Sequence, residues 1–169
     1  IIPFESPGRP DLAPLKPAKF KTLYLLHGFG GNRNDWMNYT PLRDIAERNN
    51  IAIVLPEAEN SFYVDSVSLP FRYGSLIREI VDFTRRAFPL SDRREDTFIG
   101  GLSMGGGGSF NYGMHHPELF SSVYAISAAV SPGVFASGGS AGESFPALLK
   151  AGTYGQEQIE AAKNVYFVL

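Results

Sequence analysis

Residues 97–108 read TFIGGLSMGGGG, and the interpretation of the whole chain starts from this stretch. Its first residues, β-branched and aromatic, are typical of a short buried strand, and the pattern G-x-S-x-G follows from Gly101 to Gly105. In that pattern a strand turns sharply into a helix, which holds the hydroxyl of the central Ser103 clear of the backbone. Small residues on both sides leave room for the tight turn. We therefore predict an accessible, nucleophilic serine at a strand–helix junction.

A second glycine-rich turn follows another apolar run. Residues 21–26 read KTLYLL and pass directly into HGFGG at residues 27–31. Backbone N–H groups in such a turn can stabilise the negative oxygen of a tetrahedral acyl-transfer intermediate. We assign one such donor to the N–H of Phe29 and the other to the N–H of Met104, at the positive end of the helix after the serine. His27 is predicted to brace the loop rather than to act as a base.

The composition favours one globular domain over residues 1–169, because 44% of the residues are hydrophobic and can fill a core. A net charge of −2 with scattered basic residues argues against nucleic-acid binding. The chain has no cysteine and three histidines without metal-ligand spacing, so we do not expect a thiolate metal site or a catalytic zinc. No apolar run is long enough to cross a membrane. A cysteine-free chain fits the cytoplasm, and export of a mature form stays open.

Apolar runs alternate with helical patterns, which is typical of a parallel sheet covered by helices on both faces. Strands are predicted at residues 22–26, 51–55, 97–100, 122–127 and 165–169. Helices are predicted at residues 41–48, 73–88, 104–116 and 156–163. The buried face of the second helix is expected to consist of Leu76, Ile80, Phe83 and Ala87. We expect residues 1–19 to be extended and residues 131–145 to form a surface loop near the site.

Several further stretches accompany the serine motif. They are LYLLHGFGGN at residues 23–32, Trp36, VLPE at residues 54–57, FIGGLSMGG at residues 98–106 and HPELF at residues 116–120. Together they resemble the putative esterase family, which contains esterase D (S-formylglutathione hydrolase), tributyrin esterases, and feruloyl and acetyl xylan esterases. The resemblance is strongest to the tributyrin esterases, through YLLHG, FYVD at residues 62–65 and GLSMGG. It covers most of residues 23–127 and is weak beyond residue 131.

The resemblance implies an α/β-hydrolase fold and a serine carboxylesterase that hydrolyses short-chain acyl esters through an acyl-enzyme on Ser103, with a small-molecule ester as its partner and no cofactor. Feruloyl, acetyl xylan and S-formylglutathione substrates are alternatives with the same chemistry. The resemblance also implies that Trp36, Tyr63 and Asp65 lie near the acyl or leaving-group pocket. For Trp36, packing in the core is an equally good interpretation. Self-association into a homo-oligomer stays open.

The acid and the base of a catalytic triad are missing from this pattern. In this fold the triad residues follow the chain order Ser, Asp or Glu, His, yet only His115 and His116 follow Ser103. They lie at the other end of the predicted helix, roughly 18 Å away at about 1.5 Å per residue, where they would complement the helix dipole. We expect the chain to lack segments at both ends, with the histidine beyond Leu169. The alternative is an inactive relative that binds a ligand or partner through the same cleft.

Overall fold

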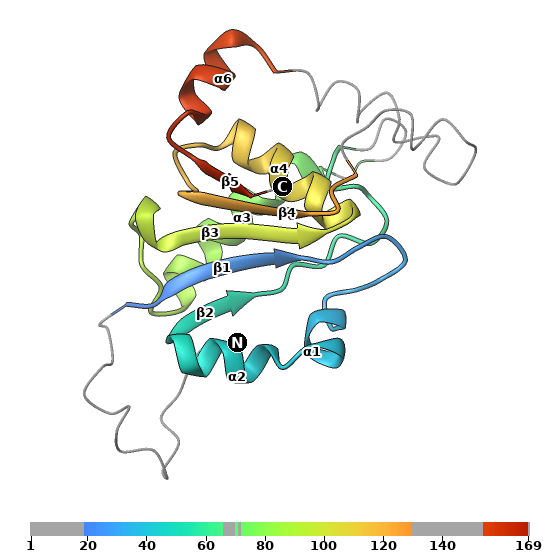
Figure 1. The fold of residues 1–169 in the computed structure, drawn as a ribbon, viewed down its shortest axis with the longest axis vertical. Coiled ribbons are helices and arrows are strands. Elements are labelled where there is room, and N and C mark those ends of the chain that lie inside the picture. The colour runs from blue at the N-terminus through green and yellow to red at the C-terminus, as the bar shows by residue number, and fades with distance from the viewer. Residues whose placement is uncertain (1–18, 66–69, 71, 130–153, 169) are drawn as a thin grey trace.

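The computed structural model describes residues 19–65, 70, 72–129 and 154–168. These residues form a five-stranded parallel sheet with helices on both faces (Figure 1), which confirms the predicted fold class. The predicted extended segment at residues 1–19, except for Lys19, and the predicted loop at residues 131–145 lie outside the described residues. Within the described part of the chain, no helix is long and apolar enough to cross a membrane. The same residues contain no group of three potential metal ligands.

The sheet has the strand order β2-β1-β3-β4-β5. The strands are β1 (Lys21–Leu26), β2 (Ile51–Val54), β3 (Thr97–Leu102), β4 (Ser122–Ile126) and β5 (Tyr166–Val168). All five were predicted, with ends that differ by a residue or two. After β1 the chain forms β2 on one side of β1, and it then crosses to form β3 on the other side. The direction of winding therefore changes between β1 and β3. Open parallel sheets bind ligands at the carboxyl ends of the strands at such a switch point.

The helices in the described residues include the four that the sequence predicts. They are α1 (Asp35–Tyr39), α2 (Leu42–Asn49), α3 (Tyr73–Ala87), α4 (Met104–His115) and α6 (Gln156–Ala162), with a short 3₁₀ helix η2 (Arg94–Asp96) before β3. The elements α1 and η2 were not predicted. Helices of five and three residues are too short for a hydrophobic period to be read from the sequence.

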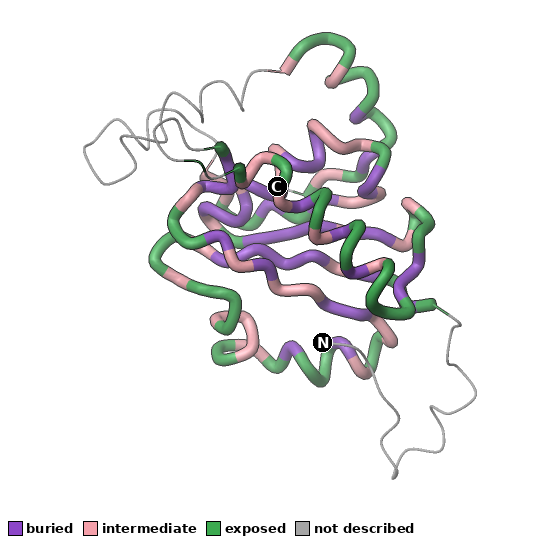
Figure 2. Tube along the Cα trace, turned by 180° about the vertical axis from the view of Figure 1, so that it is seen from behind, coloured by how far each residue is buried: buried purple, intermediate pink, exposed green. Residues whose placement is uncertain are grey.

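Two layers of helices follow from the alternation of side chains along β1, because successive residues of a strand point to opposite faces. Tyr24 and Leu26 join a core cluster with residues of α3 and α4. Leu25 joins the cluster on the other face, which contains Leu42 and Ala46 of α2. Figure 2 shows mostly buried residues along the central strands and exposed residues on the outer sides of the helices. The central strands are thus covered on both faces, and their carboxyl ends open to one edge.

The buried face of α3 matches the prediction in part, because Leu76 and Ile80 are half-buried and pack against the core cluster. Phe83 is 59% exposed and Ala87 is exposed, whereas Ile77, Val81 and Thr84 are buried. A polar residue can occupy this face because the hydroxyl of Thr84 donates to the carbonyl oxygen of Ile80 and lies 2.9 Å from the hydroxyl of Tyr24. The buried row is therefore displaced by one residue from the purely apolar row that the periodicity favours.

Candidate active site

Ser103 lies at the junction that the sequence predicts, between the last residue of β3 and the first residue of α4. Its backbone has φ 55° and ψ −111°, a region that favours glycine and costs another residue of order 1–3 kcal/mol. Three backbone hydrogen bonds hold this conformation. The Ser103 N–H donates to the carbonyl of Ile126 (2.9 Å), and the Ser103 carbonyl accepts from Gly107 (2.9 Å) and Ala129 (3.0 Å). The sharp turn is thus fixed by its surroundings.

The glycines on both sides of Ser103 are required by close backbone packing. A Cβ atom at Gly101 would lie 2.4 Å from the carbonyl carbon of Gly105. A Cβ atom at Gly105 would lie 2.5 Å from the carbonyl oxygen of Leu26, at the end of β1. Both distances are too short for any side chain. The first turn of α4 is therefore packed directly against the ends of β3 and β1.

The glycine-rich loop after β1 passes beside the serine. A Cβ atom at Gly28 would lie 3.9 Å from the Cβ atom of Ser103 and 3.5 Å from the carbonyl oxygen of Leu102. The N–H of Gly31 closes a turn onto the carbonyl of Gly28 (3.2 Å), and Gly30 has φ 74°. The backbone of the loop therefore lies next to Ser103. A loop that donates N–H groups to a reacting oxygen needs this closeness.

The side chain of His27 packs beneath this loop, on its buried side, and holds it by a hydrogen bond. This side chain is fully buried, and Nδ1 donates to the carbonyl oxygen of Gly28 (2.9 Å). Nε2 lies 3.2 Å from the backbone nitrogen of Ala58 and 3.1 Å from Oε1 of Glu57. Both ring nitrogens are thus engaged with the scaffold, which is the bracing position that the sequence predicts for His27.

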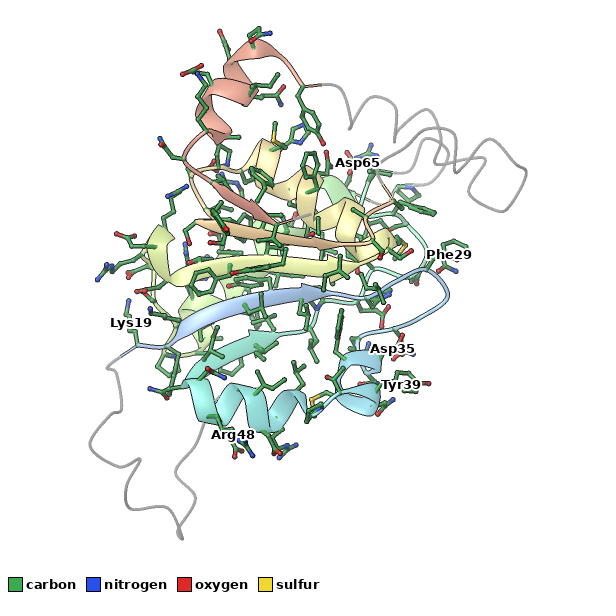
Figure 3. All side chains as sticks on the ribbon, viewed as in Figure 1. Lys19, Phe29, Asp35, Tyr39, Arg48 and Asp65 are labelled. Carbon is green, nitrogen blue, oxygen red and sulfur yellow. The ribbon has the colours of Figure 1, made fainter. Side chains whose placement is uncertain are left out.

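A cavity of about 430 Å³ lies at the carboxyl ends of β1 and β3. It is lined by Leu102, Ser103, residues 27–31, and Asp35, Trp36, Tyr39 and Thr40. Figure 3 shows Phe29, Asp35 and Tyr39 gathered at this end of the sheet, with Lys19 and Arg48 at the opposite end. The cavity thus lies at the switch point of the sheet, where ligand sites of parallel sheets occur.

Three of the predicted site residues, Ser103, Phe29 and Trp36, line this cavity. The Met104 side chain is buried in the core, so only its backbone can serve the site. Tyr63 and Asp65 do not line the cavity. Tyr63 is fully buried and its hydroxyl donates to the carbonyl of His27 (3.1 Å), while the exposed Asp65 accepts from the N–H of Gly74 (2.8 Å).

The predicted place of Tyr63 and Asp65 near the acyl or leaving-group pocket stays a prediction, while the contacts that the described residues show for them are scaffold contacts. The reason is the backbone: Phe62 and Tyr63 have φ 54° and φ 60°, which turns the chain locally so that the ring of Tyr63 is directed into the core. Burial raises the pKa of the Tyr63 hydroxyl far above its ordinary value, which keeps it neutral as a hydrogen-bond donor. The position of Tyr63 within the FYVD stretch does not reveal that its side chain is directed into the core.

The histidines at the end of α4 do not reach Ser103, as the sequence predicts. His115 is the last residue of α4, and Ser103 precedes the first. The Nδ1 atom of His115 donates to the carbonyl of Asn111 (2.9 Å), and Nδ1 of His116 lies 3.5 Å from Glu118. Burial lowers the pKa of His116 despite Glu118, so its contribution of positive charge to the helix end is weaker than predicted. Each of the three histidines is thus engaged with groups other than the Ser103 side chain.

Trp36 lies both at the cavity and against the core, the two positions that the sequence left open. It lines the cavity and packs against the core cluster of α2, and its Nε1–H donates to the carbonyl of Leu26 (3.0 Å). We expect Trp36→Phe to lower the free energy of unfolding by about 1 kcal/mol, because the Leu26 carbonyl loses its donor. Urea unfolding checks this, with Tyr39→Phe at the exposed rim as the control. Equal stability of Trp36→Phe and wild type would contradict the prediction.

Glu57 and Asn60 do not line the cavity but bond to the loop that does, and neither of them was assigned a role from the sequence. Both follow β2, which neighbours β1 in the sheet, and both accept hydrogen bonds from the loop after β1. The available signal was the position of Glu57 in VLPE, shortly after a predicted strand. Polar residues at the carboxyl ends of neighbouring parallel strands gather at one edge of the sheet.

The carboxylate of Glu57 makes the stability of the site dependent on pH. Burial raises its pKa, but the N–H groups of Arg33 and Glu59 and the nearby His27 and Arg33 side chains outweigh burial, so the net pKa lies below the ordinary 4.5. A lowered folded-state pKa stabilises the fold above pH 4.5 and ceases to do so as the pH falls through the folded value. We expect the Tm difference between wild type and Glu57→Gln to shrink from pH 7 to pH 3. Parallel melting curves over that range would contradict this.

The geometry agrees with a family match. The Esterase family model, described as Putative esterase, matches residues 14–164. The chain belongs to this esterase family. Within the family it is similar to an acetyl esterase of Caldicellulosiruptor saccharolyticus, with 40% identity over 131 residues that cover 77% of this chain and 49% of the relative. The chain thus spans about half the length of that curated relative. The family prediction is confirmed, and the finer likeness to tributyrin esterases stays a prediction.

Solved structures confirm the α/β-hydrolase fold for this member of the esterase family. The fluorophosphonate-binding serine hydrolase F of Staphylococcus aureus matches with a TM-score of 0.74 and 27% identity, over 88% of this chain and 57% of that chain. An S-formylglutathione hydrolase of Staphylococcus aureus matches with a TM-score of 0.74 and 23% identity, over 98% and 68% of the two chains. A ferulic acid esterase matches with a TM-score of 0.70 and 23% identity, over 92% and 67%.

Proposed function

We propose that the protein is a serine carboxylesterase with Ser103 as its nucleophile. The observation that carries this proposal is the backbone of Ser103, held at φ 55° between β3 and α4 at the wall of the cavity. A strained conformation persists only where the surrounding structure enforces it, and such residues cluster at active sites. Membership of the esterase family supports the same chemistry.

The oxyanion hole consists, in this proposal, of the N–H groups of Phe29 and Met104. The loop that carries Phe29 passes beside Ser103, as the position of Gly28 shows. Met104 is the first residue of α4, and the first N–H groups of a helix have no partner within the helix. The positive end of the helix dipole adds to their effect. A donor of this kind contributes about 10²- to 10³-fold to kcat.

The reaction proceeds in two steps. The Ser103 oxygen bonds to the carbonyl carbon of the ester, the hydroxyl proton passes to a base outside the described residues, and the alcohol leaves with a proton. Water then attacks the acyl-enzyme and releases the acid. The residues described here supply the nucleophile, the oxyanion donors and the cavity. No metal or other cofactor takes part in the proposed steps.

Short-chain acyl esters are the proposed substrates. The relative from Caldicellulosiruptor saccharolyticus is named an acetyl esterase, and the cavity beside Ser103 has about 430 Å³. Aromatic side chains from the loop and from α1 line it, namely Phe29, Trp36 and Tyr39. This lining suits an apolar acyl or alcohol group next to the reacting carbonyl.

A substrate panel tests the proposal on the whole natural protein. We expect p-nitrophenyl acetate and butyrate to show the highest kcat/KM, above the decanoate ester, methyl ferulate and S-formylglutathione. A preference for methyl ferulate or S-formylglutathione would be consistent with the proposed serine mechanism but would contradict the proposed substrate class. Absence of hydrolysis for every ester would overturn the enzymatic proposal.

An inactive binding protein is the second candidate. The observation in its favour is that all three histidines lie among the described residues and each is engaged away from Ser103. This candidate requires that Ser103 remain unlabelled by a fluorophosphonate in the whole natural protein, whereas the esterase requires labelling.

A further inference from the structure

Two polar side chains from the connection after β2 hold the loop that carries Phe29. The Oδ1 atom of Asn60 accepts from the N–H of Gly30 (2.7 Å), the residue directly after Phe29. The Oε2 atom of Glu57 accepts from the N–H of Arg33 (3.1 Å), further along the same loop. The loop is thus bonded at two points to a segment that follows the neighbouring strand, across sequence separations of 24 and 30 residues.

Glu57 also contacts the residue at the start of the loop. Its Oε1 atom lies 3.1 Å from Nε2 of the buried His27, whose Nδ1 donates to the carbonyl of Gly28. Oε1 accepts from the N–H of Glu59 (3.2 Å) as well, and Oε2 lies 3.5 Å from the guanidinium of Arg33. These contacts connect one carboxylate to both ends of the turn that surrounds Phe29.

The loop needs external support to serve as a donor. Gly28, Gly30 and Gly31 allow many backbone conformations, and within residues 28–31 a backbone turn bond joins Gly31 to Gly28 (3.2 Å). Other internal bonds of the loop lie further on, between residues 32 and 35. An oxyanion donor is effective only when its nitrogen lies about 2.7–3.1 Å from the oxygen that becomes negative. A displacement of about 1 Å can lower a rate by about 10²-fold.

We propose that Glu57 and Asn60 are positioning residues for ester hydrolysis, which hold the N–H of Phe29 at the distance that the oxyanion requires. The inference rests on the proposed function, because it takes the Phe29 N–H as an oxyanion donor. Glu57 acts through His27 and Arg33, and Asn60 acts through Gly30. Neither side chain touches the reacting atoms in this arrangement.

A positioning role differs measurably from a general structural role. The Glu57 side chain is 32% exposed and Asn60 is exposed, and neither belongs to a hydrophobic cluster of the described residues. Their removal should therefore cost the fold little, since partly exposed polar pairs contribute less than about 1 kcal/mol. Their removal should instead weaken the stabilisation of the transition state, which would lower kcat with little change in KM.

The test compares Glu57→Ala, Asn60→Ala and Asn60→Asp in the whole natural protein, with p-nitrophenyl acetate as substrate. We expect kcat to fall roughly 10- to 100-fold in the alanine variants while KM changes less than about twofold. The Ki of a trifluoromethyl ketone, which forms a tetrahedral adduct with the serine, should rise by the same factor as kcat/KM falls. Asn60→Asp keeps an acceptor oxygen for Gly30 and should recover most of the activity. Glu95→Gln, exposed beside the amino end of β3, is the matched control.

The outcomes separate this inference from the proposed function. If wild type hydrolyses the ester and the alanine variants keep kcat and Ki within about twofold, the positioning role is wrong and the esterase proposal stands. A fall in Tm with equal losses in all kinetic constants and no recovery in Asn60→Asp would also overturn it. If wild type shows neither turnover nor labelling, both proposals fail. The loss of kcat, the parallel rise of Ki and the recovery in Asn60→Asp together establish the positioning role.

Discussion

Ser103→Ala is expected to lower ester hydrolysis by the whole natural protein by at least about 10⁴-fold and to abolish covalent labelling by a fluorophosphonate. The reason is that the acyl-enzyme requires the Ser103 oxygen, and oxyanion donors and binding alone leave only a small residual rate. Intact mass spectrometry measures the labelling, with one adduct expected in wild type and none in the variant. The loss in kcat is measured with p-nitrophenyl acetate.

Ser75→Ala is the matched control, because Ser75 is an exposed serine on α3 and forms no part of the cavity lining. It should keep both the adduct and the activity. Labelling that persists in Ser103→Ala would show that another residue is the nucleophile. An unlabelled wild-type protein would favour the inactive binding protein instead.

Gly105→Ala is expected to destabilise the fold by about 3 kcal/mol, at the upper end of the usual cost of overpacking. The added methyl group would lie 2.5 Å and 2.6 Å from the carbonyl oxygens of Leu26 and His27. Helix propensity alone would favour alanine at this position of α4 by about 1 kcal/mol. A loss of stability would therefore show that the steric contact outweighs helix propensity, and a gain would show the opposite. We expect Tm to fall by roughly 6–12 °C, the shift that about 3 kcal/mol produces in a domain of about 150–250 residues. Differential scanning calorimetry measures the shift.

Gly155→Ala is the control for that variant. Gly155 precedes α6 with φ −75°, and a Cβ atom there would meet no atom closer than 3.7 Å. We expect this change to cost less than about 1 kcal/mol. An unchanged or higher Tm in Gly105→Ala would mean that α4 can move away from β1, and it would contradict the packing described above.

The sequence was sufficient to predict the sheet, four of the helices and the turn at Ser103. These features depend on local signals, namely apolar runs, helical periodicity and the small residues around one serine. The position of Ser103 relative to the loop after β1 also followed, because parallel strands place their carboxyl ends at one edge. The family match at residues 14–164 confirms the resemblance on which the expected chemistry rests.

Features that depend on contacts between distant residues were missed or misplaced. The buried row of α3 includes Thr84 because its hydroxyl meets Tyr24, which no local pattern shows. Tyr63 turns into the core because two consecutive residues have positive φ. The support of the loop by Glu57 and Asn60 depends on hydrogen bonds between segments after different strands. A charged residue after a strand is common, and only the structure shows which loop it holds.

The strained backbone of Ser103 lowers the stability of the fold, although the proposed reaction requires a serine at this position. Glycine adopts φ 55° readily, and the strain of about 1–3 kcal/mol that it would relieve is equal to or larger than its extra backbone entropy of about 0.5–1 kcal/mol. A library of variants sorted only for abundance or thermal tolerance would therefore enrich glycine at this position, and the enriched proteins would have lost the hydroxyl that we propose as the nucleophile. Serine at position 103 is maintained only where selection acts on the reaction itself.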